Sequence, residues 1–371
     1  MFGLLMLVPL VYEFAVGDPI RDPLRVIGFG LPSALALISG TVLKRNFRLP
    51  PLDGRQAMLV TALGWVVVSG IGSLPFWIGL RMSFVDAYFE AVSGLTTTGI
   101  TMLQGLDALP PSILFWRSFI QWIGGLGILA FFLAILYTGG SAQLMYSAES
   151  HKIFSRRPVP GLFHTLRLLW LIYGGLTAAI AAALWLEGMP LFDSIAHSMT
   201  ALSTGGYSPH DASIGYYAQA GYRHYALMEY TVIAGMVGGG MSFLVHSRAL
   251  RGELRALWDG LEMRLFWLII AGATALVMFD HTRSIGFAAL RPSEFHDLFR
   301  GSLFQVSSIL TTTGFATKDI GSDFFPAASK QVFLALMLVG GCVGSTAGGV
   351  KVLRIGILLK MLGRQILRAT Y

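Results

Sequence analysis

Charged residues and cysteine are both scarce in this chain of 371 residues. Asp, Glu, Lys and Arg make up 13% of the sequence, whereas a soluble protein carries about 25%. The single cysteine, Cys342, excludes an internal disulfide and a cysteine-rich metal site. The sequence also contains no Walker loop, no metal-ligand spacing and no nucleophile–base pattern. We therefore expect no enzyme and no bound cofactor.

Apolar residues and glycine take the place of the missing charge. Hydrophobic residues make up 54% of the chain, and the mean hydropathy is +0.65. The 44 glycines suit close helix packing and irregular backbone inside a membrane. The net charge of +7 alone would be compatible with nucleic-acid binding, but the placement of the basic residues argues against it. The composition predicts an all-α integral membrane protein that crosses the bilayer several times and contacts lipid.

The basic residues gather in alternate gaps between the apolar stretches. Under the positive-inside rule, these gaps face the cytoplasm and the intervening loops open outward. Solvation of loop ends explains the charges themselves but not their alternation. The four basic clusters are Lys44, Arg45, Arg48 and Arg55; Lys152, Arg156, Arg157 and Arg167; Arg248, Arg251, Arg255 and Arg264; and Lys360, Arg364 and Arg368.

Three short hydroxyl-and-glycine segments lie in the outward loops at a nearly constant spacing. They are Thr96–Gly99, Ser203–Gly206 and Thr311–Gly314, and their equivalent glycines Gly99, Gly206 and Gly314 are 107 and 108 residues apart. The match extends upstream in register and includes polar residues, hydroxyls and two aspartates. Three matches in register at one period indicate internal duplication. Nine residues before the glycine stand Glu90, His197 and Gln305, and six residues before it stand Ser93, Thr200 and Ser308. Thirteen residues before it stand Asp86 and Asp193, whereas the third segment has Gly301 there.

The repeat predicts three units, each built from a spanning helix, a short helix, the Thr/Gly loop and a second spanning helix. An apolar helix pair near 1–17 and 24–43 precedes them. Helices of about 12 residues cannot cross a hydrocarbon core of about 30 Å, so the short helices must enter the membrane and turn back. The predicted helices of the three units are 56–80, 84–95 and 112–138; 165–187, 190–202 and 223–247; and 264–280, 294–310 and 326–360. The predicted domain ranges are 1–55, 56–150, 151–255 and 256–371, with a glycine-rich break at 340–351.

The three loops have the chemistry of a filter for monovalent cations. Thr, Ser and Gly offer neutral oxygens, which can replace the hydration shell of such an ion, whereas divalent sites recruit carboxylates. The C-terminal end of a short helix also favours a cation. Any single loop could equally be an ordinary helix cap and turn. The predicted ion ligands are the backbone carbonyls of Thr97, Thr98, Gly99, Thr204, Gly205, Gly206, Thr312, Thr313 and Gly314.

These motifs resemble the TrkH family of bacterial potassium uptake subunits, within the Trk/Ktr/HKT superfamily. The similarity covers nearly the whole chain and rests on five segments. It implies helix–pore loop–helix units in a pseudo-fourfold arrangement around one potassium pathway. It also implies a homodimer and a cytosolic, nucleotide-binding regulatory subunit of the TrkA kind, in the inner membrane of a bacterium. The five segments are 93–99, 121–127, 205–216, 311–315 and 340–351.

The chain departs from the family in the number of units, because the family has four and this sequence shows three. A fourth glycine at the same period would fall about 50 residues beyond Tyr371. The alternative function is therefore a non-conducting fragment, or part of a split transporter that needs a separate fourth unit. On that basis we expect residues 1–371 alone not to conduct selectively. A third possibility, an ion-coupled secondary transporter, fits less well because all the repeats run in the same direction.

A glycine-rich segment interrupts the last apolar stretch. By resemblance, it is the unwound middle of the third unit's second helix, below the filter. Such a break can form a movable gate, and Lys351 could repel cations when the gate is closed. The small residues could instead allow tight helix crossing, with Lys351 extending to the cytoplasmic face. The predicted gate residues are Gly344, Ser345, Thr346, Gly348, Gly349 and Lys351.

The polar residues that recur upstream of the three loops have structural roles that need no contact with the ion. We expect Glu90 and His197 to hydrogen-bond the loop backbone rather than contact the ion. Asp86 and Asp193 lie near the outer starts of the short helices, where they suit the helix dipole or could draw cations to the mouth.

Overall fold

The computed structural model describes residues 2–17, 22–47, 54–125, 127, 162–286 and 291–370. Most of the first repeat's second predicted helix beyond Gly125 therefore lies outside the described residues. The basic residues Arg48, Lys152, Arg156 and Arg157 also lie outside them. Among the described residues, all regular secondary structure is helical apart from one isolated bridge between Val339 and Val350.

The chain divides into two compact units, and each is described by itself. The first contains residues 1–167 together with 207–211, and the second contains residues 168–206 and 212–371. The short segment 207–211 thus belongs to the first unit although residues of the second unit flank it on both sides. These units group the sequence differently from the predicted repeats, whose boundaries stay predictions.

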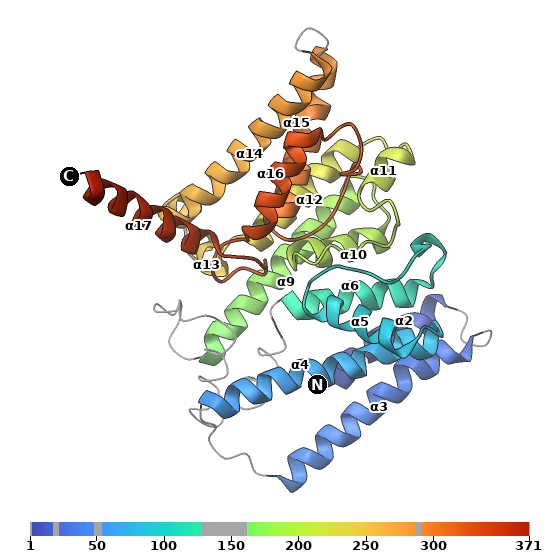
Figure 1. Ribbon diagram of the computed structural model, residues 1–371. Helices are drawn as coiled ribbons and strands as arrows, with labels where there is room; N and C mark the ends of the chain where they lie inside the picture. Colours follow the sequence, from blue (N-terminus) through green and yellow to red (C-terminus); the bar gives the residue numbers. More distant parts are fainter. Residues whose placement is uncertain are drawn as a thin grey trace. The chain divides into compact units, whose positions relative to one another are not determined.

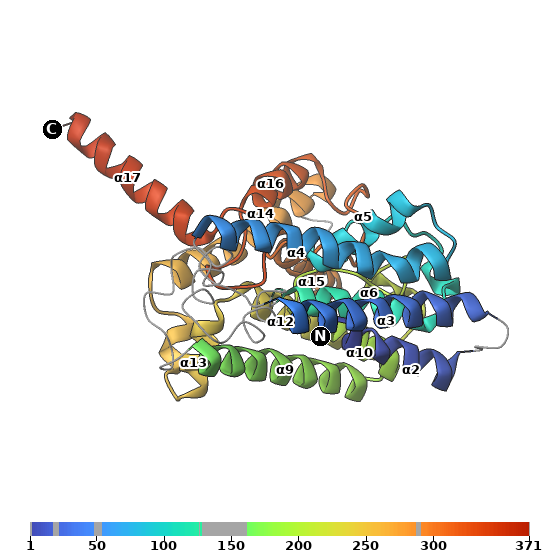
Figure 2. The ribbon, with the colours of Figure 1, turned by 90° about the horizontal axis from the view of Figure 1, so that it is seen from below.

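The first unit begins with the predicted apolar pair, followed by the first repeat. Residue Met6 separates two short helices that together form the first member of the pair. The long helices α3 and α4 lie side by side, and α5 packs against both α4 and α6 (Figures 1 and 2). The elements are α1 Phe2–Leu5, α2 Leu7–Val16, α3 Pro23–Asn46, α4 Gly54–Leu74, η1 Pro75–Gly79, α5 Phe84–Leu95, η2 Leu106–Ala108 and α6 Pro111–Gly125.

The second unit holds the second and third repeats. Helix α12 packs against α10 and α15, while α14 packs against α15, α16 and α17. Helix α17 runs outward from the rest of this unit (Figures 1 and 2). The elements are α9 Leu162–Leu186, α10 Leu191–Leu202, α11 Gly215–Gln219, α12 Tyr225–Gly240, α13 Phe243–Leu250, η3 Leu254–Leu257, α14 Leu261–Ile285, α15 Pro292–Leu310, α16 Ala327–Leu338 and α17 Val352–Thr370.

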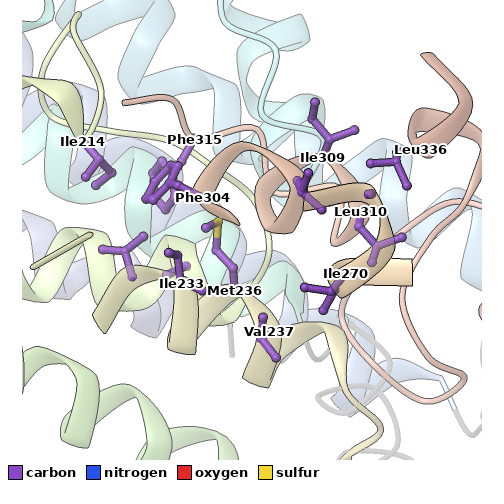
Figure 3. Packing of buried hydrophobic residues seen from close by; sticks show 14 of the residues in the cluster. Ile214, Ile233, Met236, Val237, Ile270, Phe304, Ile309, Leu310, Phe315 and Leu336 are labelled. Carbon is purple, nitrogen blue, oxygen red and sulfur yellow. The ribbon is translucent and has the colours of Figure 1, made fainter. Parts of the chain in front are cut away.

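The second unit has a continuous apolar core around the third short helix. Side chains of α12, α14, α15 and α16 meet there, and Figure 3 shows Met236 of α12 and Phe304 and Leu310 of α15 among them. Phe315, which follows the third loop, is fully buried in the same cluster. The core therefore fixes the position at which α15 ends and its loop begins.

The apolar outer surfaces of the long helices identify the chain as a membrane protein. Among the described residues, four helices are long and apolar enough to span a membrane, or five if the bent pair α12–α13 counts as one span. Leu171 and Leu268 on two of these helices are 63% and 66% exposed. Large exposed apolar surfaces suit a lipid environment. The chain is thus an all-α, multi-pass integral membrane protein built from helix–loop–helix units.

The prediction of one continuous helix over 223–247 is wrong. Helix α12 ends at Gly240, and α13 leaves it at an angle of 106°. The last carbonyls of α12 accept bonds from a distant segment, because Cys342 N donates to Gly240 O and Thr346 N donates to Gly239 O. Those bonds, together with three consecutive glycines of low helix propensity, end the helix.

The stretch predicted over 326–360, with its glycine-rich break at 340–351, forms two helices. Helix α16 ends at Leu338 and α17 begins at Val352, so residues 339–351 are not helical. Gly340 N donates to Val350 O at 2.9 Å, which brings the two ends of this segment together. A Cβ at Gly340 would lie 1.8 Å from Gly348 O, so the closure requires glycine.

Candidate functional site

The three Thr/Gly loops follow the same backbone path. Each short helix ends at a leucine, and two residues later a threonine adopts the left-handed conformation: Thr97 at φ 53°, Thr204 at φ 53° and Thr312 at φ 55°. The glycines follow at φ 79°, 79° and 89°. A β-branched residue with positive φ is an outlier that persists only where its surroundings hold it. The same unusual geometry therefore occurs once in each repeat.

The small hydroxyl residue six positions before the glycine closes two of the loops. Ser93 Oγ donates to Ile100 O, and Ser308 Oγ donates to Phe315 O, both at 2.6 Å. In the second loop, Thr200 Oγ1 donates instead to Ala196 O in its own helix. The same backbone hydrogen bond occurs in all three loops, where the N–H groups of Thr98, Gly205 and Thr313 donate to the carbonyls of residues 93, 200 and 308. These bonds fix each loop onto the end of its helix.

The second and third loops touch through their backbones. A Cβ built on Gly206 would lie 1.9 Å from Thr313 O, closer than any real contact allows. At Gly314 the same construction meets no atom within 4 Å. Glycine at 206 is therefore required both by the positive φ and by the neighbouring carbonyl, whereas glycine at 314 is required by the positive φ alone.

In the first and second repeats, a glycine of the following helix packs on the end of the short helix. A Cβ at Gly124 in α6 would lie 2.0 Å from Leu95 O, and one at Gly239 in α12 would lie 2.4 Å from Leu202 O. The first and second repeats thus share this close approach as well as the loop geometry. Each contact lies directly behind a filter-like loop.

Alanine at either glycine is expected to destabilise the protein by about 1–3 kcal/mol, the usual cost of overpacking. Melting of the detergent-solubilised protein would measure the effect. Gly174→Ala and Gly272→Ala are matched controls, because a Cβ at either helical site meets nothing within 4 Å. They should melt at or above the wild-type temperature, since glycine within a helix is less favourable than alanine. Equal melting of Gly124→Ala and Gly174→Ala would contradict the close packing.

A buried ion pair stands behind the first loop. Arg117 Nε donates to Glu90 Oε1 at 2.9 Å, and the two side chains are 1% and 0% exposed. Glu90 Oε2 also accepts from Met102 N, which confirms the expectation that this carboxylate bonds the loop backbone. Sequence reasoning missed Arg117. Its signal was a lone charge inside the apolar stretch 111–125, since buried charges are paired.

Arg117 also joins the first repeat to the segment that follows the second glycine. Its Nη1 donates to Ser208 O at 3.0 Å, and its guanidinium lies 4.1 Å from the centre of the Tyr207 ring. The Tyr207 hydroxyl in turn donates to Glu90 O at 3.0 Å. One guanidinium thus holds a helix, its loop and the segment 207–211 within the first unit.

The first unit has a second polar contact, between the loop after Gly99 and the segment 207–211. His210 Nδ1 pairs with Asp107 Oδ1, and Leu106 N donates to Asp211 Oδ2 at 3.0 Å. The hydrogen bond from His210 lowers the pKa of the Asp107 carboxyl. The stabilisation from this carboxylate is present above its ordinary pKa and is lost as the pH falls through the lowered value.

A second ion-pair network joins helices of the second and third repeats, and here the arginine lies on the short helix. Arg300 of α15 donates to Glu229 of α12 at 2.7 Å and to Asp297 at 2.6 Å. Lys318 completes the network by bonding Asp297 at 2.8 Å. Sequence reasoning missed this network also, because its members are separated by up to about ninety positions of sequence that only the fold brings together.

The other polar residues singled out in the sequence lie behind the loops. Asp86 and Asp193 occupy the first turns of α5 and α10, as predicted, and Asp193 accepts a bond from Tyr217. The His197 ring contacts the rings of Tyr217 and Phe315, so its bond to the loop backbone stays a prediction. Gln305 is buried at the same position of α15.

The glycine-rich segment contacts the third loop and the end of the short helix before the second loop. Gly348 N donates to Thr312 Oγ1 at 2.7 Å, and Thr346 Oγ1 donates to Leu202 O at 2.9 Å. Glu262 of α14 accepts from Val343 N at 2.7 Å. Lys351 is partly buried, and its ammonium bonds Ala347 O of the same segment. The predicted filter residues of the second and third repeats and the predicted gate residues are therefore neighbours within one unit.

Comparison with known proteins agrees with this geometry. A profile of the TrkH family, described as a cation transport protein, matches residues 31–369. The potassium uptake protein TrkH of Salmonella typhimurium is 37% identical over 329 residues, which cover 86% of this chain and 65% of that protein. The TrkH of Halomonas elongata is 33% identical over 99% of this chain and 74% of its own length.

A solved structure shares the fold. The crystal structure of the potassium transporter TrkH from Vibrio parahaemolyticus superposes with a TM-score of 0.83 at 32% identity, covering 100% of this chain and 74% of that one. The chain thus spans about two thirds to three quarters of the length of these relatives. With its repeated loops, its membrane helices and this similarity along nearly its whole length, the chain belongs to the TrkH family of cation transport proteins.

Proposed function

We propose that the chain takes up potassium across the bacterial cytoplasmic membrane as a pore-forming subunit. The observation that carries the proposal is the threefold occurrence of a left-handed threonine and a positive-φ glycine at the end of a short helix. Such a path exposes successive neutral oxygens beyond the negative end of a helix, which suits a dehydrated monovalent cation. The relatives' names as potassium uptake proteins support the same ion.

In this proposal the ion is the cargo and no cofactor is needed. The carbonyls of the nine predicted filter residues coordinate potassium, and the segment containing Gly344–Lys351 acts as the gate. The relatives are named as parts of a Trk system, which supports partner subunits. We propose a cytosolic, nucleotide-binding subunit of the TrkA kind and a homodimer of the pore subunit. The similarity to named potassium uptake proteins does not favour the alternative, a non-conducting fragment, and an uptake assay decides between the two.

Ion uptake tests the proposal directly. The full-length protein, expressed in a bacterium without its own potassium uptake, should restore growth at low potassium and take up potassium and rubidium in preference to sodium. Each loop is built around one equivalent glycine, which gives a short coordinated path, so we expect some sodium leakage. The same protein with Gly206→Ser serves as the matched control and should lose selectivity. Equal uptake of sodium and potassium by the unaltered protein would refute the proposed filter.

A further inference from the structure

Two threonines of the predicted filter are hydrogen-bonded to the glycine-rich segment. Thr204 and Thr312 are the left-handed residues of the second and third loops. Thr312 Oγ1 accepts from Gly348 N at 2.7 Å, and Thr204 Oγ1 donates to Thr346 Oγ1 at 3.2 Å. The segment is thus bonded to the residues whose strained conformation sets the direction of the loop carbonyls.

Thr346 is the central residue of this contact. Its hydroxyl lies 2.9 Å from Leu202 O at the end of α10 and 3.0 Å from Gly239 O at the break of α12. Its backbone N–H donates to Gly239 O at 3.1 Å. One side chain therefore joins the end of a short helix, a filter threonine and the broken helix.

We propose that Thr204, Thr312 and Thr346 form a latch that couples the gate to the filter, with Thr204 and Thr312 acting as positioning residues. The inference rests on the proposed role of residues 340–351 as the gate. The segment cannot leave its place without breaking the bonds at Thr312 and Thr204. Left-handed threonines are held only by their surroundings, so loss of these bonds frees their backbone to turn and redirects the adjoining carbonyls. Opening of the gate and selection of the ion are then linked.

The latch can be removed without altering side-chain shape. Valine replaces threonine with nearly the same volume but without the hydroxyl, while serine keeps the hydroxyl. Thr346→Val lies outside the filter, and Thr312→Val lies within it. Thr282→Val is the matched control, because Thr282 Oγ1 bonds Met278 O within its own helix, α14, and the residue lies outside the glycine-rich segment and the filter loops.

The first measurement follows the position of the segment without using transport. Cys342 lies in the segment and is fully buried, so its rate of modification by a membrane-permeant maleimide reports exposure of the segment. Mass spectrometry of the full-length protein in proteoliposomes would identify the labelled peptide. We expect labelling about two- to tenfold faster in Thr346→Val and Thr312→Val, the range set by the net contribution of a hydrogen bond. The serine variants and Thr282→Val should label at the wild-type rate.

The second measurement is rubidium flux together with the ratio of potassium to sodium uptake. The latch predicts that Thr346→Val raises the flux and lowers the ratio, although this residue is not a filter ligand. Wild-type labelling of Cys342 in both valine variants would overturn the proposal, as would a raised flux with an unchanged ratio in Thr346→Val. If Thr312→Val fails to assemble, Thr346→Val decides the question. Absence of potassium uptake by the wild type would refute the proposed function, while the labelling experiment would still test the latch.

Discussion

Replacing Arg117 with methionine is expected to destabilise the protein by about 3–5 kcal/mol, the cost of leaving one partner of a buried pair uncompensated. Glu90, its partner, is fully buried and would keep a charge with no cation beside it. The substitution also removes the donor to Ser208 O and the cation over the Tyr207 ring. Methionine retains the apolar volume of the arginine stem, so the loss is chiefly electrostatic. The yield of folded protein and its melting temperature in detergent would both fall.

A double variant separates the charge from the packing. Glu90→Gln combined with Arg117→Met removes both charges and keeps an amide at position 90 that can still accept the bond from Met102 N. We expect it to recover much of the lost stability, because replacing a whole buried pair by neutral groups is often close to neutral. Arg283→Met, at an exposed position, is the control and should change stability by less than about 0.5 kcal/mol. If the double variant melted no higher than Arg117→Met, the uncompensated charge would not be the cause.

Alanine at Gly206 is expected to abolish potassium selectivity, whereas alanine at Gly314 should weaken it. Both glycines have positive φ, which costs a residue with a Cβ roughly 1–2 kcal/mol. Only at Gly206 does the added carbon also collide with the carbonyl of Thr313, at 1.9 Å. That carbonyl is itself a proposed ion ligand, so the collision displaces a second filter loop.

Potassium, rubidium and sodium uptake at matched protein levels would measure the difference between the two variants. The strain at Gly314 alone corresponds to a change of about five- to thirtyfold in the population of the wild-type loop. Gly206→Ala should exceed it and should lower the ratio of potassium to sodium uptake towards one. Gly174→Ala provides the control for expression, since its site has open space. Equal losses at 206 and 314 would show that contact between the loops has no part in selection.

The sequence was sufficient to place the short helices and their loops. The predicted ranges 84–95, 190–202 and 294–310 differ by at most two residues from α5, α10 and α15. Their ends are set locally, by the glycines and hydroxyls that follow each helix, and a repeated pattern shows such local signals three times. The predicted filter and gate roles remain proposals, because they depend on an ion and on movement.

The features that the sequence did not reveal depend on distant partners. The break after Gly240 arises because Cys342 and Thr346, about a hundred positions further along the chain, take the last carbonyls of α12. No property of 223–247 alone marks that event, apart from three glycines that also suit helix packing. Likewise, the role of Arg117 becomes apparent only from its bonds to Glu90 and Ser208, which lie on other segments.

The segment 207–211 makes the order of synthesis matter. It belongs to the first unit but leaves the ribosome after residues 168–206 of the second. Until then Arg117 can pair with Glu90 but cannot donate to Ser208 O, and Asp107 cannot pair with His210. The bonds that 207–211 makes in the first unit can therefore form only after residues 168–206, which include α10, have been synthesised. The first unit therefore cannot be completed until part of the predicted second repeat has been synthesised.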